Sequence, residues 1–461
     1  MLKRAVGIGM AFIGLIVGAG FASGQEMLQF FVAFGIRGVV GAVIASVLMI
    51  ISGIAALQLG SYLLAKEHTV VFRRVSNPWV AWFLDATTII TLFSIGFVMF
   101  AGGGANMAQQ FDWPVWVGAG LTLAAVLAAG MFDVNRVSAI IGAITPFIII
   151  FMVGISAWTL LTSDYDVAAL DLAARQVQTS LPNWWVGALN YLGLTAITAV
   201  SMTIVIGGNM LDTRTAGLGG LIGGGMYLAL LVLAVVALYL QVGTVGDDEL
   251  PMLTLVNGVH PFLGVVMSVV IFGMIFNTAL GMFYALGKRL TRDRPERFRA
   301  VYVATVLVGF ALSFVGFRDL VSYVYPALGY LGLVLIVVMG VGWLKRRKRI
   351  AAEIERRHRL HRLARRRLDP ARAFNEEHAA EVRRIARDSV LPDAELRQAM
   401  LDEVDAVLTA DPTVDYPAEE PSDSVAGATS SYPPTGKPLG ERPPAAGTPE
   451  GPDPEDAKPP K

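Results

Sequence analysis

The chain has 461 residues, of which 54% are hydrophobic and 16% charged, and its formal net charge is zero. Charged residues are concentrated in the last quarter, so the first 344 residues are typical of an integral membrane protein, for which we expect no nucleic-acid partner. The sequence has no cysteine, which excludes a disulfide framework, thiol catalysis, iron–sulfur clusters and cysteine zinc sites.

Ten apolar segments are expected to cross the lipid bilayer as helices. They lie near residues 5–34, 39–65, 80–110, 115–131, 137–162, 184–210, 216–242, 260–287, 300–316 and 320–344. Lysine and arginine are concentrated in alternate loops, on the side of the N-terminus. We therefore predict a multi-pass protein of the cell inner (plasma) membrane with both termini in the cytoplasm.

The first apolar segment carries small, flexible residues at its centre, including Gly18, Gly20 and Gly24, followed by the carboxylate of Glu26. Glycine in a helix interior costs about 1 kcal/mol relative to alanine, so the helix is weak where it would cross the membrane. An unwound backbone at that depth must line a cavity or be buried by protein, as at the binding sites of secondary transporters. The alternative is that these glycines only allow close helix packing, for which Gly14 and Gly18 have the right spacing.

A second weakened segment opens the other half of the membrane region. Beyond residue 184, an apolar run is interrupted by Gly193, Thr195, Thr198, Ser201 and Thr203. Weakened segments at matching positions in two halves indicate an inverted repeat with the binding site between them. We therefore predict an all-α integral membrane protein with two five-helix repeats, about 5–162 and 184–344, whose first and sixth helices are broken.

Two strings of residues resemble a known family. Val17–Glu26 and the segment Asn277–Met282 are similar to the YkvI-like family of uncharacterised membrane proteins, which is distantly similar to the amino acid–polyamine–organocation superfamily. The resemblance covers about residues 1–344. It implies a LeuT-type fold, in which the glycine-rich string is the break in the first helix, and it implies transport.

The broken first helix would offer a substrate site without any arginine. The N-terminus of its outer half, near Ala19 to Ser23, has free N–H groups and a partial positive charge that suit a substrate carboxylate. The predicted substrate-binding residues come from the first, third and sixth spans: Gly18, Ala19, Gly20, Phe21, Ser23, Phe93, Phe97, Tyr191, Gly193, Leu194 and Thr195.

The end of the inner half exposes carbonyl oxygens that suit a cation. The resemblance to LeuT-type carriers implies a sodium ion as coupling ion, and no other cofactor is expected. Its ligands would be the backbone oxygens of Gly14, Val17 and Met274 and the side chains of Asn277 and Thr278. Alternatively, the Thr278 hydroxyl only bonds a carbonyl of its own helix.

Gln25 and Glu26 are predicted to take part in gating or proton transfer. Glu26 is the only acidic residue clearly inside a span, and its charge is costly there unless it is paired, hydrated or protonated. It could carry a proton, contact a substrate amine, form an outer gate, or only hold helices together.

The sequence does not favour an enzyme. The five histidines lie in loops or in the C-terminal part, and no metal-ligand spacing appears within the spans. The glycine-rich run 217–225 lacks the Lys-Ser/Thr ending of a phosphate-binding loop.

Three regions outside the spans have compositions that predict their structure. Residues 252–256 could form a short lid helix over the bundle, or only a surface loop. The basic helix 345–368 could contact anionic lipids, or could be a solvated topology anchor, within a cytoplasmic helical region 345–410. Residues 411–461 are rich in proline and are predicted to be disordered.

These features favour a cation-coupled secondary transporter of an amino acid or a similar small zwitterion, working by alternating access within the lipid bilayer. The alternative is a non-transporting membrane sensor that binds a ligand in the bundle and signals through its cytoplasmic tail. A channel is disfavoured because the spans show no repeated rings of charge. Substrate identity, coupling ion and transport direction stay open at this point.

Overall fold

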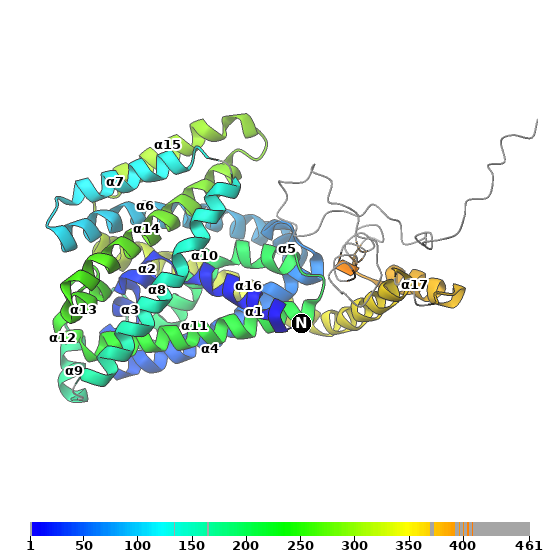
Figure 1. Ribbon diagram of the computed structural model, residues 1–461, viewed down its shortest axis with the longest axis horizontal. Coiled ribbons are helices and arrows are strands. Elements are labelled where there is room, and N and C mark those ends of the chain that lie inside the picture. The colour runs from blue at the N-terminus through cyan, green and yellow to red at the C-terminus, as the bar shows by residue number, and fades with distance from the viewer. Residues whose placement is uncertain are drawn as a thin grey trace, which may run out of the picture. The chain divides into compact units, whose positions relative to one another are not determined.

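A computed structural model describes residues 2–132, 134–163, 166–368 and 373–391, and five single positions between residues 396 and 408. This part of the chain is almost entirely helical (Figure 1). It divides into two compact units, Met1–Lys348 and Arg349–Lys461.

The first unit holds the membrane region. Its elements are, in chain order, α1 (Leu2–Ile16), α2 (Ala19–Ser23), α3 (Gln25–Phe30), η1 (Val32–Phe34), α4 (Ile36–Leu63), α5 (His68–Val75), α6 (Pro78–Phe111), α7 (Val115–Ala129), α8 (Val134–Thr162), α9 (Val167–Ala174), α10 (Trp184–Gly208), α11 (Thr213–Leu240), α12 (Val242–Val245), α13 (Pro251–Val259), α14 (Pro261–Leu290), η2 (Pro295–Arg297), α15 (Phe298–Leu312) and α16 (Phe317–Leu368), which continues into the second unit. Each of the ten apolar segments predicted from the sequence overlaps at least one of these helices.

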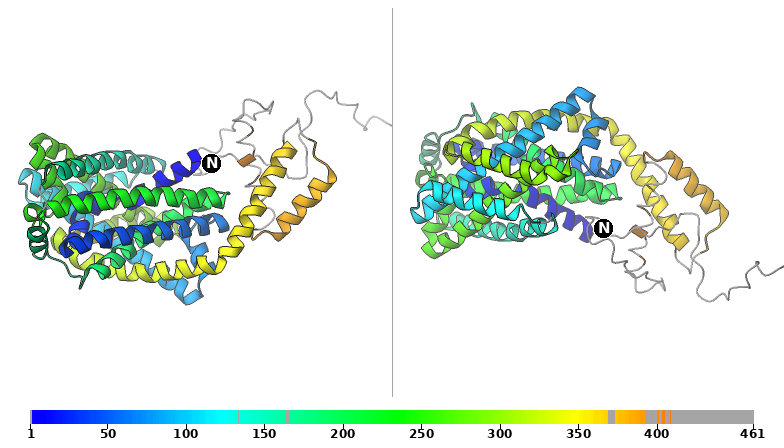
Figure 2. Two further views of the ribbon diagram at one scale, coloured as in Figure 1. Left: turned by 90° about the horizontal axis from the view of Figure 1, so that it is seen from below. Right: turned by 90° about the horizontal axis from the view of Figure 1, so that it is seen from above.

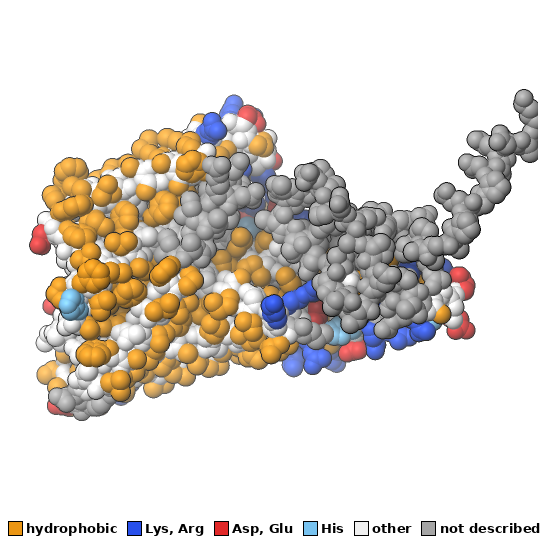
Figure 3. Space-filling view, viewed as in Figure 1, with side chains coloured by type: hydrophobic (Ala, Val, Ile, Leu, Met, Phe, Trp, Pro, Cys, Tyr) orange, Lys and Arg blue, Asp and Glu red, His pale blue; other side chains and the backbone are white. Residues whose placement is uncertain are grey.

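The length and composition of these helices confirm a membrane protein. Among the described residues, six helices are long and apolar enough to cross a bilayer: α4, α6, α10, α11, α14 and α16. The helix α7 and residues 146–162 of α8 are shorter apolar helices. Hydrophobic side chains cover much of the visible face of this unit in Figure 3, as expected of a surface that contacts lipid.

The long helices pack in two groups. The helices α1, α4, α10 and α11 contact one another, and so do α6, α7, α14 and α15. The helix α8 contacts both groups, through α11 and α14. In Figure 1 and Figure 2 the pair α4 and α11 lies on one side of the unit, and the pair α7 and α15 lies on the other.

The glycine-rich run in α11 forms the contact surface within the first group. A Cβ on Gly223 would lie 2.5 Å from the carbonyl oxygen of Gly9 in α1, and one on Gly220 would lie 2.9 Å from the backbone nitrogen of Ile54 in α4. Any side chain at these positions would push the backbones apart. These glycines therefore serve close helix packing.

The predicted break in the sixth span is wrong. The helix α10 runs without interruption from Trp184 to Gly208, because its threonine hydroxyls bond carbonyls of their own helix instead of replacing its hydrogen bonds. Thr195 donates to the carbonyl of Tyr191 at 2.8 Å, and Thr203 donates to that of Ala199 at 2.8 Å.

The second unit begins with the C-terminal part of α16 and contains α17 (Glu376–Asp388). Arg359 binds Glu381 of α17 with two hydrogen bonds, at 2.8 and 2.9 Å, and the Asn375 side chain caps the start of α17. Leu360 and Leu363, two apolar residues of the predicted basic helix, are buried. The predicted disordered tail 411–461 lies outside the described residues.

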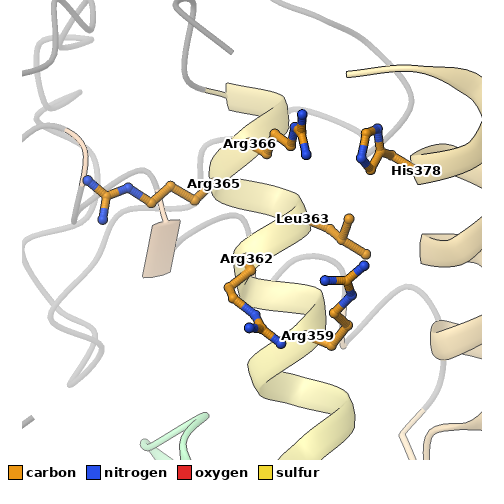
Figure 4. A pocket seen from close by; sticks show the side chains of 6 residues that line it. All are labelled: Arg359, Arg362, Leu363, Arg365, Arg366 and His378. Atoms are coloured by element: carbon orange, nitrogen blue, oxygen red, sulfur yellow. The ribbon is translucent and has the colours of Figure 1, made fainter. Parts of the chain in front are cut away.

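A pocket in this unit has a volume of about 330 Å³ and is mostly basic. Figure 4 shows Arg366 and His378 directed toward one another across the gap between α16 and α17, whereas Arg365 points away from it. Its lining residues are Arg359, Arg362, Leu363, Arg365, Arg366 and His378.

Candidate functional site

The first span is interrupted at its centre. The helix α1 ends at Ile16, and α2 begins at Ala19 after an extended Gly18, with φ −99° and ψ −171°. The N–H groups of Val17 and Gly18 bond the carbonyls of Ile13 and Ile16. The carbonyls of Gly14 and Leu15 are therefore left without a backbone donor from their own helix.

A second interruption follows five residues later. Gly24 has the left-handed φ of 84°, which turns the chain between α2 and α3. The Ser23 hydroxyl stabilises this turn, since it donates to the carbonyl of Gly20 at 2.8 Å and accepts the N–H of Gln25 at 3.2 Å. Ser23 therefore has a clear structural role at the break.

The helix α14 meets the first interruption. The N–H of Ala19 donates to the hydroxyl oxygen of Thr278 at 3.4 Å, and a Cβ on Gly18 would lie 3.9 Å from the same oxygen. Its neighbours Met274 and Asn277 are buried on the same helix. The structure thus brings Thr278, which was predicted to act with the break, into contact with it. This contact joins the two helix groups, because α14 belongs to one group and α1 to the other.

Glu26 folds back over the break. A Cβ on Gly20 would lie only 1.7 Å from the Oε1 atom of Glu26, so this carboxylate occupies the space that Gly20 leaves open. The Tyr191 hydroxyl of α10 donates to Oε2 of Glu26 at 3.2 Å. The Glu26 side chain is half-buried and has no ion-pair partner among the described residues.

Aromatic residues surround this carboxylate. The Tyr227 hydroxyl lies near the side chains of Tyr191 and Thr195, and the rings of Tyr227 and Phe21 are 6.2 Å apart. The buried Tyr325 of α16 lies close enough to interact with the charge of Glu26. Sequence reasoning missed Tyr227 and Tyr325, although each is a tyrosine within an apolar span.

Gln25 carries a second polar group at this level. Its side chain is completely buried, and neither its amide oxygen nor its amide nitrogen has a hydrogen-bond partner among the described residues. Such a group costs about 1–3 kcal/mol in a folded protein. Gln25 therefore offers a hydrogen-bond donor and an acceptor directly after the second interruption.

Four other predicted substrate-binding residues have no described contact with the break. The rings of Phe93 and Phe97 pack against each other, at 5.6 Å between centroids, and Phe93 packs against Phe283 of α14 at 6.3 Å. Gly193 faces α16, where a Cβ would lie 2.1 Å from the carbonyl oxygen of Gly329. Leu194 is buried in α10. The described contacts of Phe93, Phe97 and Gly193 do not involve the break.

A short helix covers the second interruption. Residues 251–259 form α13, so the lid-helix interpretation is confirmed over the surface loop. A Cβ on Gly24 would lie 2.8 Å from the Met252 side chain. Gln109 of α6 holds the start of this helix through hydrogen bonds with Leu250 and Thr254.

The opposite end of the bundle is held by charged residues. Arg289 at the end of α14 pairs with Asp85 of α6, and Arg292 pairs with Glu67 at 3.2 Å. The Nε2 atom of His68 lies 3.6 Å from Asp85. Burial, together with the charge of Arg289, lowers the pKa of His68 below its usual value.

Comparisons with known proteins agree with this architecture. No family model matches the chain. The chain is 24% identical over 332 residues to the uncharacterised membrane protein YkvI of Bacillus subtilis (strain 168), a match that covers 71% of this chain and 93% of YkvI. The resemblance predicted from the sequence is thus confirmed.

Solved structures identify the fold. The structure of MhsT in complex with L-phenylalanine superposes with a TM-score of 0.51 at 10% identity, over 86% of this chain and 98% of MhsT. The chain is thus an all-helical protein whose fold is similar to that of LeuT-fold transporters, whereas the two five-helix repeats stay a prediction. Mhp1, a nucleobase-cation-symport-1 family transporter, matches 69% of this chain and 74% of its own at 11% identity, with a TM-score of 0.43.

Proposed function

We propose that this protein is a cation-coupled secondary transporter of an amino acid or a similar small zwitterion. The observation that carries this proposal is the interrupted first helix, which lies at the contact between two separately packed helix groups. Rocking of one group against the other around such a break would expose the site to the two sides of the membrane in turn. The LeuT-type fold and the amino acid bound by MhsT favour amino acid-like cargo.

Oxygen atoms beside the first interruption support the proposal of a sodium ion as coupling ion. The Gly14 carbonyl has no backbone donor from its own helix, and the Thr278 hydroxyl lies against the same break. Neutral carbonyl and hydroxyl oxygens suit a hard monovalent cation. The predicted set, Gly14, Val17, Met274, Asn277 and Thr278, would supply them, and binding there would link the two helix groups.

The charge distribution supports an orientation for the cycle. Positive residues are concentrated at the end that holds Asp85 and Arg289, so this end would face the cytoplasm of a plasma-membrane protein, as would both termini. The helix α13 would then lie on the outer side. The ion pairs Arg289–Asp85 and Arg292–Glu67 would close the cytoplasmic side of the site, and α13 would close the outer side. These two barriers would open alternately.

A ligand-binding sensor is the second candidate, because residues beyond 349 form a compact unit with a basic pocket. Deleting residues 350–461 separates the two functions. A transporter whose machinery lies within the membrane region should retain uptake in proteoliposomes, whereas a sensor that signals through its tail should lose its response.

The first test is the thermal stability of the purified full-length protein with each common amino acid, in sodium and then in potassium buffer. A ligand that binds only the folded state raises stability by RT ln(1 + [L]/Kd). We expect one class of amino acid to stabilise the protein, more strongly in sodium, and to be taken up into proteoliposomes. No stabilisation and no uptake in either salt would contradict amino acid transport.

A further inference from the structure

Glu26 is a carboxylate in an apolar bundle without a matching cation. Its described polar partner is the Tyr191 hydroxyl, and it forms no ion pair in the described part of the chain. The segment from Ala5 to Ile36 contains no lysine or arginine, and neither does α10. A carboxylate in a membrane interior is costly until a positive charge or a proton neutralises it.

The groups around Glu26 complement a positive charge. Tyr191 contacts Glu26 and Tyr227 lies near it, so both supply hydroxyl oxygens that can accept hydrogen bonds, and Tyr227, whose ring is 6.2 Å from that of Phe21, also supplies an aromatic face. An ammonium group is attracted both by a carboxylate and by the face of an aromatic ring. A substrate carboxylate would be repelled by the same surroundings.

The position of Glu26 also changes which end of a zwitterion is recognised at the break. Its Oε1 atom lies against Gly20, in the first turn of α2, where the sequence suggested a site for the substrate carboxylate. The chain's own carboxylate already lies there. A ligand group that binds beside Glu26 and Gly20 should therefore carry a positive charge, not a negative one.

From these observations we propose that Glu26 binds the ammonium group of the substrate, so that the substrate class is defined by a primary amine rather than by a carboxylate. This inference rests on the proposed transport function. It extends the cargo from amino acids to small amines that lack a carboxylate, and it excludes analogues in which the amine is replaced by a hydroxyl.

Matched triplets of ligands test this assignment: an amino acid, the amine formed by its decarboxylation, and the 2-hydroxy acid with the same side chain. Leucine, isopentylamine and 2-hydroxyisocaproate form one such triplet, and other side chains give the rest. We expect thermal stabilisation of the full-length protein by the amino acid and the amine of at least one triplet, and none by the hydroxy acid.

Two glutamine substitutions provide the variants. Glu26→Gln keeps the size of the side chain and should weaken amine affinity about ten- to a hundredfold, because a charge-assisted hydrogen bond is lost. Glu296→Gln makes the same change at an exposed position and should leave the affinity unchanged. The melting temperature without ligand shows whether each variant is folded, and Tyr191→Phe should weaken amine binding less than Glu26→Gln does.

The possible failures are distinguishable. Binding of a hydroxy acid as tightly as its amino acid would overturn the inference but leave transport standing. Unchanged amine affinity in Glu26→Gln, with an altered pH dependence of uptake, would also overturn it and would assign Glu26 to proton transfer. If no triplet member binds or is transported by the wild-type protein, the proposed function fails, and the inference fails with it.

Discussion

The first and sixth spans differ in a way that their compositions do not reveal. Both carry small and polar residues at the centre, yet the first is interrupted at Gly18 and again at Gly24, whereas α10 is continuous. Threonines in α10 bond their own helix, so they leave its backbone hydrogen bonds intact. Glycine permits the left-handed φ of Gly24 and the close approach of Glu26 to Gly20.

Alanine substitutions at one glycine in each span should show which glycine is required for helix packing. The largest loss of stability is expected in α10. In Gly193→Ala, the Cβ would lie 2.1 Å from the Gly329 oxygen and 2.9 Å from the Leu333 nitrogen, both backbone atoms, so about 1–3 kcal/mol of stability should be lost. In Gly18→Ala, the nearest atom is Thr278 Oγ1 at 3.9 Å, and the extended backbone suits alanine.

Melting temperatures of the two variants in detergent check this contrast. Gly193→Ala should melt several degrees below the wild type, and Gly18→Ala within about two degrees of it. Equal melting temperatures would mean that the contact between α10 and α16 is looser than the structure shows.

Removing buried amides should have opposite effects in the two spans. Gln25→Met should raise stability by about 1–2 kcal/mol, because the amide has no described partner, and it should reduce ligand binding if the amide contacts the substrate. Asn190→Leu should lower stability by about 1 kcal/mol, because the Asn190 amide nitrogen donates to the Pro326 carbonyl at 2.9 Å. Thermal unfolding checks both signs; destabilisation by Gln25→Met would show that the amide is satisfied.

Thr278→Val tests the link between α14 and the broken span. It removes the acceptor of the Ala19 N–H, so we expect a loss of about 1 kcal/mol in stability. The dependence of ligand binding on sodium should be lost as well, since the predicted ion site includes this hydroxyl. Titration calorimetry with sodium and potassium checks this, and full retention of a sodium effect would remove Thr278 from the ion site.

The smallest effect is expected for Thr203→Val in α10. The side chain is buried, but its hydroxyl bonds only the Ala199 carbonyl of the same helix, which keeps its backbone partner. The change should alter stability by about 0.5 kcal/mol or less. A larger loss in thermal unfolding would show that back-bonded threonines do more for α10 than the contacts indicate.

Local sequence patterns were sufficient for the helices and for the first interruption, and the resemblance to LeuT-type carriers implied its contact with Thr278. They could not exclude a break in α10. Whether Thr195 interrupts the helix or leaves it continuous depends on which acceptor its hydroxyl bonds. They also could not place Tyr227 and Tyr325 beside Glu26, because this depends on how α11 and α16 are rotated when they pack. The folding back of Glu26 over Gly20 is likewise a property of the turn at Gly24.

The contact of α13 with Gly24 offers a direct way to test for the proposed transport cycle. Because Met252 fills the space beside this turn, α2 cannot move far without moving α13. Gly258 on the same helix is exposed and has no atom within 4 Å of its Cβ position, and the natural chain contains no thiol. Gly258→Cys would therefore place a single fluorescent or spin label on α13, which the proposed cycle requires to move, in an otherwise unmodified protein.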